Sequence, residues 1–161
     1  MTPSFEGPAV FVSDLAASRR FYGDILGQSL LFAVGDAYAA YRGFSLWQAS
    51  AARETIFGET PVKTTEAQGR KNFEMYFETE ELDATWERLT AEAIEAVHPI
   101  REEPWGQRNF RVLDPDGHVV EFGEPMPFVA RRFLAQGLSA QETAARTMLP
   151  IEMIQALDAP R

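Results

Sequence analysis

The sequence predicts an α+β fold made of two βαβββ modules and a helical C-terminal extension. Apolar residues alternate with a period of two in some segments and recur at spacings of three and four in others, which separates strands from helices. The order strand, helix and three strands occurs in residues 5–49 and again in residues 72–125. We therefore expect paired modules, joined by a linker at 50–71 and followed by an extension at 126–161.

The first module begins with a short apolar strand at Ala9–Val12. Asp14 follows it and is well placed to cap the N-terminus of a helix. Gly27 marks the end of that helix, because glycine readily adopts the left-handed conformation found there. One broad apolar stripe predicts the buried face of the helix. The stripe consists of Leu15, Phe21, Tyr22, Ile25 and Leu26.

Three strand-like runs complete the first module between Gln28 and Gln48. They are broken at Gly35-Asp36 and at Gly43, where turns are expected. The segment Ala49–Lys71 is polar and rich in turn residues, with one short helix near Ala51–Phe57. It joins the modules and is long enough to cover a pocket.

The second module shows the same order with clearer periodicity. A strand at Asn72–Thr79 precedes a helix at Glu81–Ala93, and three strands follow at Ile94–Ile100, Arg108–Leu113 and His118–Gly123. Apolar residues spaced by four, three and four define the buried helix face. They are Leu82, Trp86, Leu89 and Ala93, and Trp47 of the first module is also expected in the core.

Alternation in the strand at 72–79 separates an apolar face from a polar one. The helix is expected to cover the apolar side, so the polar residues face the other way. The apolar residues are Phe73, Met75 and Phe77, and the alternating ones are Glu74, Tyr76 and Glu78.

The last two strands can be aligned by their apolar faces. This alignment pairs Phe110 with Phe122 and places Arg111 opposite Glu121, because opposing residues of an antiparallel pair share a face. It leaves a five-residue connection at 114–118, which suits the Asp-Pro-Asp-Gly sequence there. His118 is then a turn residue. Asn109 and Arg111 lie on the polar face, which either contacts solvent or, given the duplication, lines a pocket between two sheets.

Composition excludes several classes of function. The 161 residues include no cysteine, which rules out disulfides, thiolate nucleophiles and zinc–thiolate sites. A net charge of −9 disfavours nucleic acid and anionic membranes as partners. No apolar run approaches the ~20 residues of a membrane span. We expect a cytoplasmic protein with a small-molecule ligand and no nucleic-acid or membrane partner.

The extension reads as three helices. The first spans Phe128–Gln136 and ends at Gly137, Ser139 begins the second with a capping-box pattern, and Pro150 opens the third. The segment Pro125–Arg161 holds four arginines against three acidic residues, so no basic surface for DNA exists. We expect these helices to pack on their own module or on a partner subunit.

Taken together, these segments resemble the vicinal oxygen chelate superfamily, which includes glyoxalases, extradiol dioxygenases and bleomycin-resistance proteins. The resemblance covers residues 5–125, and His98–Arg108 also resembles a subgroup of uncharacterised glyoxalase-like bacterial proteins with a similar tail. The matching segments are Val10–Leu15, Phe21-Tyr22, Leu26-Gly27, Phe77, Leu82-Asp83, Trp105-Gly106 and Asp114–Gly117 followed by Glu121.

The resemblance implies four positions for metal ligands. They correspond to Gly7, Gln48, Glu74 and Glu121, of which only Glu121 keeps the family's residue. Glu74 replaces a histidine with a carboxylate, and Gly7 offers no side chain. Glu74 and Glu121 are therefore the candidate ligands of a divalent metal ion, and their hard oxygen donors suit Mg²⁺ or Mn²⁺. The sequence leaves open whether a metal is bound.

The same two carboxylates are the candidate catalytic residues. Neighbouring carboxylates raise each other's pKa, which can make one a general base near neutrality. Arg111 opposes Glu121 and would instead keep it ionised, or bind an anionic group of the substrate. The sequence does not decide between these roles.

The resemblance implies a glyoxalase-like lyase or isomerase, or a dioxygenase relative, that acts on a small oxygenated substrate by proton transfer. The alternative is a non-catalytic binding protein for a cationic or aromatic small molecule. The missing histidine at Gly7 and the acidic charge favour that alternative. Family members are commonly dimers, so we expect a homodimer. Candidate substrate-binding residues are Phe11, Gln48, Tyr76, His98, Trp105, Asn109 and Arg111.

Overall fold

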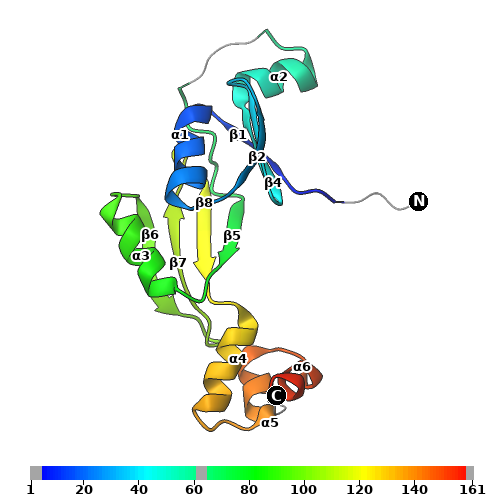
Figure 1. Ribbon diagram of the computed structural model, residues 1–161, viewed down its shortest axis with the longest axis vertical. Coiled ribbons are helices and arrows are strands. Elements are labelled where there is room, and N and C mark those ends of the chain that lie inside the picture. The colour runs from blue at the N-terminus through cyan, green and yellow to red at the C-terminus, as the bar shows by residue number, and fades with distance from the viewer. Residues whose placement is uncertain (1–4, 61–64, 159–161) are drawn as a thin grey trace, which may run out of the picture. The chain divides into compact units, whose positions relative to one another are not determined.

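A computed structural model describes residues 5–60 and 65–158, and its elements follow the expected order (Figure 1). The chain forms two compact units. The first comprises residues up to Phe73 together with Leu113–Val119, and the second comprises Glu74–Val112 together with Val120–Arg161. Two four-stranded sheets with helices confirm the predicted α+β fold. Within the described residues, no helix combines the length and apolar character that a membrane crossing requires.

The first unit holds a mixed sheet. Its strands are β1 (Ala9–Val12), β2 (Leu30–Val34), β3 (Tyr38–Tyr41) and β4 (Phe44–Gln48). They lie in the order β1-β4-β3-β2, with β1 parallel to β4 and the other pairs antiparallel. The helix α2 (Ala49–Phe57) follows β4 directly and lies in the expected linker.

Helix α1 (Leu15–Arg19) begins as predicted at Asp14, whose Oδ1 accepts hydrogen bonds from the backbone N–H groups of residues 16 and 17. The helix continues as a π-helical turn over Arg20–Ile25, in which the Leu26 N–H donates to the Phe21 carbonyl at 2.9 Å. The wider turn keeps the apolar stripe on one side. All five predicted stripe residues are buried.

The Asp-Pro-Asp-Gly turn belongs to the first unit and is held by two buried carboxylates. Asp116 accepts hydrogen bonds from the Ser13 N–H at 2.9 and 3.0 Å. Asp114 accepts from the Tyr22 hydroxyl at 2.9 Å and from the His118 N–H at 2.8 Å. Burial, followed by the charge of Asp114, raises the pKa of Tyr22 well above its ordinary value. His118 therefore acts as a turn residue, as the sequence predicts.

The second unit repeats the arrangement. Its elements are β5 (Glu74–Glu78), α3 (Leu82–Ala91), β6 (Ala96–Glu102), β7 (Arg108–Leu113) and β8 (Val119–Gly123). The strands lie in the order β5-β8-β7-β6. The Glu124 N–H donates to the Arg108 carbonyl at 3.0 Å, and the rings of Phe110 and Phe122 stack at 5.0 Å. Both contacts agree with the predicted register.

Trp86 was predicted in the core and is half-buried, with its ring 5.1 Å from the ring of the buried Phe110. Three other core predictions need correction. Helix α3 ends at Ala91, and Ala93 is exposed with a φ of 54°, whereas Thr85 is buried. Phe73 precedes β5 and is exposed, because the strand begins one residue later. Trp47 is half-buried on the face of the first sheet opposite the buried Leu46. Each difference arises where an apolar residue fits a spacing but lies beyond the element's end or on its other face.

The extension forms three helices after β8, as expected (Figure 1). They are α4 (Met126–Ala135), α5 (Ala140–Thr147) and α6 (Ile151–Asp158). The predicted capping box is present, since the Ser139 hydroxyl accepts from the Glu142 N–H and the Glu142 side chain accepts from the Ser139 N–H. Phe133 and Ile154 are buried in this helical cluster.

Candidate functional site

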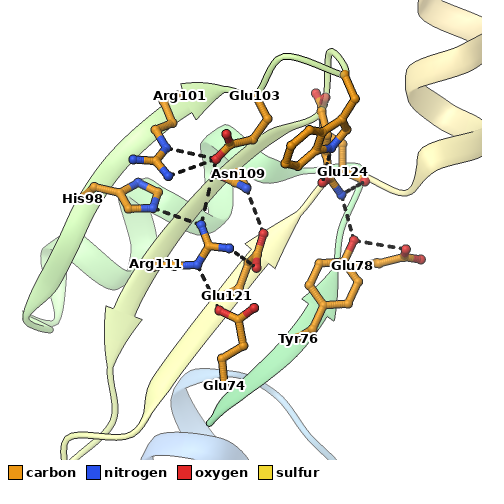
Figure 2. A network of polar contacts seen from close by, with 12 residues as sticks. Glu74, Tyr76, Glu78, His98, Arg101, Glu103, Asn109, Arg111, Glu121 and Glu124 are labelled. Atoms are coloured by element: carbon orange, nitrogen blue, oxygen red, sulfur yellow. Dashed lines mark hydrogen bonds and ion pairs between the residues drawn. The ribbon is translucent and has the colours of Figure 1, made fainter. Parts of the chain in front are cut away.

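One guanidinium group organises the polar face of the second sheet (Figure 2). Arg111 donates from Nε to Glu74 Oε2 at 3.0 Å and from Nη2 to Glu121 Oε2 at 2.5 Å. Its Nη1 lies 3.3 Å from His98 Nε2. The arginine thus bridges two carboxylates and one imidazole, all predicted site residues.

The strands explain why these residues meet. Glu74, Glu121, Arg111 and His98 come from β5, β8, β7 and β6, which are neighbours in that order. In β5, β7 and β8 the alternate residues include the buried Met75, Phe110 and Val120, which point to the opposite side. The period of two therefore gathers the polar residues on one face.

The hydrogen bonds of His98 fix its tautomer. Its Nδ1 lies 2.8 Å from the Pro99 carbonyl oxygen, which can only accept a hydrogen bond. Nδ1 must therefore carry the proton, and Nε2 is left as an acceptor for Arg111. In this arrangement a neutral His98 orients the guanidinium.

Glu121 is the most shielded carboxylate of the face, with 7% of its side chain exposed, against 42% for Glu74 and 23% for Arg111. Asn109 Nδ2 donates to Glu121 Oε1 at 2.8 Å. Burial raises the pKa of Glu121 above its ordinary value, and the nearby Glu74 adds to the rise. Arg111 and Asn109 oppose this shift without cancelling it. The site therefore contains a carboxyl group that accepts a proton more readily than an exposed glutamate.

Asn109 leaves one acceptor unused. Its side-chain Oδ1 is buried and has no hydrogen-bond partner among the described residues. The opposite amide orientation would turn Oδ1 toward Glu121 Oε1, which is also an acceptor when ionised. A buried acceptor without a donor costs about 1–3 kcal/mol. A hydroxyl group of a ligand, or a water molecule, would satisfy it.

A second chain of hydrogen bonds runs beside the carboxylates. Gln107 donates from Nε2 to the Tyr76 hydroxyl at 2.8 Å and accepts at Oε1 from Trp105 Nε1 at 3.0 Å. The Tyr76 hydroxyl donates to Glu78 Oε1 at 3.2 Å. Partial burial, with the charge of Glu78, raises the pKa of Tyr76 to about 12. Tyr76 is therefore a neutral hydrogen-bonding group near neutral pH.

Glu103 lies at the edge of the same face. Burial alone would raise the pKa of Glu103, but hydrogen bonds from Arg101 and Asn109 and the charges of Arg101 and Arg111 hold it below its ordinary value. Arg101 is 3.0 Å from Glu103 Oε1. Arg101 is thus a salt-bridge residue, and so is Arg108, which contacts Asp83 at 2.6 Å.

The carboxylates of this face do not fit a divalent metal ion. The Arg111 guanidinium lies between Glu74 and Glu121 and already contacts an oxygen of each. Across the described ranges, no three acidic, histidine or cysteine side chains gather in a way that could hold a metal. A metal ion would have to displace a bound cation and would find two donors.

The other two ligand positions implied by the resemblance lie in the first unit and are engaged locally. Gly7 has a φ of 113°, and a Cβ atom there would lie 2.0 Å from the Gly43 carbonyl oxygen, so no side chain fits. Gln48 accepts at Oε1 from the Leu15 N–H at 3.0 Å and donates from Nε2 to the Ser13 carbonyl at 2.7 Å. Both amide atoms therefore hold the connection between β1 and α1.

The first sheet carries an aromatic face. The rings of Phe11 and Trp47 meet edge to face at 6.1 Å, and Tyr38 meets Trp47 edge to face at 5.8 Å. Phe32 adds a fourth ring, 5.9 Å from Tyr38. One ring thus comes from each strand, and all four are at least partly exposed. Predicted site residue Phe11 belongs to this surface of the first unit.

Sequence reasoning missed two members of the polar face. Gln107 precedes Asn109 and Arg111 by two and four residues, so extending the period of two would have identified it. Glu103 follows Arg101 by two residues, and Arg101 pairs with Asn109 in the sheet. That pairing could not be predicted, because β6 contains irregularities that shift its register.

Comparisons with known proteins agree with the fold. The family model of the glyoxalase-like domain matches residues 5–127. A crystal structure of a protein of unknown function from Agrobacterium tumefaciens is 36% identical, with a TM-score of 0.70, over 78% of this chain and 96% of that chain. No curated protein matches the chain.

Two further crystal structures are 25% identical and have TM-scores of 0.60. One is a glyoxalase/bleomycin resistance protein/dioxygenase from Nocardioides, covering 77% of this chain and 84% of that chain. The other is a glyoxalase-related enzyme from Fulvimarina pelagi, covering 78% of this chain and 89% of that chain.

Proposed function

The chain belongs to the glyoxalase-like domain family, and from this we propose that it is an enzyme that moves a proton on a small neutral oxygenated substrate. Membership indicates a small-molecule enzyme or binding protein. The observation that favours an enzyme is the shielded Glu121 carboxylate, with a raised pKa, beside the fixed charge of Arg111. A base with a raised pKa and a cation close by are what proton abstraction next to a carbonyl requires.

The proposed reaction is isomerisation of an α-hydroxy carbonyl compound. The Glu121 carboxylate takes the proton from the carbon beside the carbonyl, and the electron pair of that C–H bond moves to form an enolate. Arg111 uses three of its nitrogens for Glu74, Glu121 and His98, but a guanidinium has five N–H groups, so donors remain for the enolate oxygen. The hydroxyl proton then moves to the enolate oxygen, which leaves the negative charge on the other oxygen. Return of the abstracted proton to the former carbonyl carbon completes the isomerisation.

Charge and hydrogen bonding support a neutral substrate with a hydroxyl group. Glu74 and Glu121 together with Arg111 carry a net charge of −1 when ionised, which disfavours an anion. The unpaired Oδ1 of Asn109 can accept a hydrogen bond from the substrate hydroxyl. Asn109 also orients Glu121 through its amide group.

The test follows deuterium incorporation into hydroxyacetone in D₂O by proton NMR. Wild-type protein is expected to accelerate exchange beside the carbonyl, and Glu121→Gln to lose roughly 10²–10⁴-fold of that rate, the usual contribution of a general base. The thermal midpoint should stay within a few degrees, because glutamine keeps the shape and a partner for Asn109. Glu87→Gln, on the exposed side of α3, is the matched control. Equal rates for Glu121→Gln and Glu87→Gln would refute the assignment.

A second candidate function is supported by the aromatic face of the first sheet. Partly exposed rings such as Trp47 and Phe11 suit stacking with a flat aromatic compound, and aromatic rings also attract cations. This function would be binding without turnover. Calorimetric titration with N-methylquinolinium tests it: binding that is lost in Trp47→Leu but kept in Glu121→Gln, with no product formed, would favour the binding protein. No binding would remove this candidate.

A further inference from the structure

The helical extension contacts the sheet of its own unit at the turn between β6 and β7. Arg132 of α4 donates from Nη2 to the Gly106 carbonyl at 2.5 Å. The ring of Phe133, the next residue, covers Gly106 so closely that a Cβ atom there would lie 2.2 Å from Phe133 Cζ. Gly106 has a φ of 86° and closes the turn by donating its N–H to the Glu103 carbonyl at 2.8 Å. Two adjacent residues of α4 therefore hold this turn.

Arg132 also binds a buried carboxylate at the end of β8. Its Nη1 donates to Glu124 Oε1 at 3.0 Å, and Glu124 is 2% exposed. Glu124 Oε2 in turn accepts from the Arg108 N–H at 3.1 Å, at the first residue of β7. A single guanidinium thus joins the turn to the carboxylate that anchors the start of the strand.

The turn is connected to the candidate site through Gln107. Its Nε2 donates to the Glu124 carbonyl and to the Tyr76 hydroxyl, both at 2.8 Å. Gly123 makes room for this contact, since a Cβ atom there would lie 2.7 Å from Gln107 Nε2 and 3.0 Å from Tyr76 Cε2. Figure 2 shows Tyr76, Glu78 and Glu124 beside the Arg111 cluster. The contacts are continuous from α4 to the polar face.

Helix α5 fixes α4 in this position. The Arg146 guanidinium lies 4.9 Å from the centre of the Phe133 ring and contacts Glu102 of β6 at 3.2 Å. Helices α4 and α5 of the extension therefore both contact the segment around this turn. The family model ends at residue 127, so α5, α6 and nearly all of α4 lie beyond the matched range.

We infer that Arg132 and Phe133 are positioning residues of the candidate site, and that the extension sets which ligand groups the site accepts. They hold Gly106 and Glu124, on either side of Gln107 in this contact chain, and Gln107 donates to the Tyr76 hydroxyl. One lone pair of this hydroxyl is taken by Gln107, and its proton is directed to Glu78. The remaining lone pair accepts a hydrogen bond, so the positioned Tyr76 selects ligands that present a donor. The statement about ligands rests on the proposed function, whereas the statement about position does not.

The experiment uses NMR of the full-length protein and three variants. Arg132→Lys keeps the charge but removes the forked guanidinium that hydrogen-bonds to both Gly106 and Glu124, and Phe133→Leu removes the ring over Gly106. Arg131→Ala is the matched control, because Arg131 is the exposed neighbour on the same helix. The readouts are hydrogen exchange at the Arg108 N–H and at the Trp105 indole, together with the ring shifts of Tyr76.

Arg132→Lys and Phe133→Leu are expected to speed exchange roughly tenfold or more at both groups, the effect of weakening a hydrogen bond to a charged group. They should also move the ring resonances of Tyr76. Arg131→Ala should do neither. A merely structural role would lower the thermal midpoint but leave the Tyr76 resonances unchanged at temperatures where the protein is folded, and this result would overturn the inference.

The carboxyl titration of Glu121 separates this inference from the proposed reaction. It should match wild type in all three variants, because Asn109 and Arg111, which hydrogen-bond to Glu121, belong to β7 and not to the extension. If wild-type protein exchanges hydroxyacetone, Arg132→Lys should raise KM severalfold with little change in kcat. If it does not, the proposed reaction fails, and the Arg108, Trp105 and Tyr76 signals still decide the role of the extension.

Discussion

Replacing Arg111 with alanine tests the central feature of the site, a carboxylate kept in a shielded place by one cation. The loss can be worked out from its three hydrogen bonds. The bond to Glu74, which is 42% exposed, contributes at most about 1 kcal/mol after solvent screening. The bond to neutral His98 contributes about 1 kcal/mol. Glu121 is 7% exposed, and leaving it ionised without its cation costs about 2 kcal/mol, less than for a fully buried pair because Arg111 itself is 23% exposed.

The variant should therefore lose about 3–4 kcal/mol of unfolding free energy at neutral pH. The loss should depend on pH. Arg111 lowers the pKa of Glu121, so its removal raises that pKa further above the unfolded value. A group whose pKa is raised by folding stabilises the fold at low pH and loses this contribution as pH rises through the folded pKa. The destabilisation by Arg111→Ala should thus grow from pH 5 to pH 8.

Urea unfolding followed by tryptophan fluorescence at pH 5 and pH 8 measures this. Arg101→Ala is the matched control, because Arg101 is 54% exposed and its pair with Glu103 should contribute about 0–1 kcal/mol at both pH values. Adding Glu121→Gln to Arg111→Ala should recover much of the loss, since the unpaired charge is then gone. A loss that equals the control, or that does not change with pH, would refute the reasoning.

Three other substitutions test the fold around the site. Tyr22→Phe removes the buried hydroxyl that donates to Asp114 at 2.9 Å, and should lower the unfolding free energy by about 1–2 kcal/mol in urea titrations. Gly7→Ala should lower the thermal midpoint sharply, because its Cβ would lie 2.0 Å from the Gly43 carbonyl oxygen; an unchanged midpoint would contradict the geometry. Ser139→Ala should cost about 1 kcal/mol by calorimetry, the usual loss of an N-cap, and no change would show that the cap is dispensable.

The period of two was enough to predict that Glu74, Arg111 and Glu121 share the polar face, although it did not identify Glu103. It placed Arg111 opposite Glu121 because the apolar residues on either side, Phe110 and Phe122, had to share the covered face. It could not predict that one guanidinium would bridge two carboxylates. That depends on side-chain rotamers and on the order of strands, with β8 between β5 and β7, which the sequence does not specify.

The wrong core predictions have a local cause. Ala93 fits the apolar spacing of the helix, but alanine is small and its burial contributes little, so the spacing says nothing about where the helix ends. Trp47 was expected in the core, although alternation with the buried Leu46 points it the other way. In such a strand, the alternation of buried and exposed residues should outweigh the apolar character of a single side chain.

The expected homodimer stays a prediction.

Contacts between the extension and the site could not be predicted for a different reason. Arg132 and Gly106 are 26 residues apart, and each looks ordinary in its own segment. Arg132 reads as a surface residue of a helix, and Gly106 reads as a turn glycine. Only the fold shows that the absent side chain at Gly106 makes room for Phe133.

The residues at the family's ligand positions form a consistent set in this chain. Position 7 cannot hold a side chain, both amide atoms of Gln48 are used within its own unit, and Arg111 supplies positive charge between Glu74 and Glu121. A guanidinium carries one charge and stabilises a developing enolate through directed N–H groups, whereas a divalent ion would do so by coordination. The reaction rate at such a site falls at low pH, where Glu121 is protonated and cannot accept a proton. The raised pKa of Glu121, and Arg111, which restrains that rise, would therefore determine the pH at which the protein works.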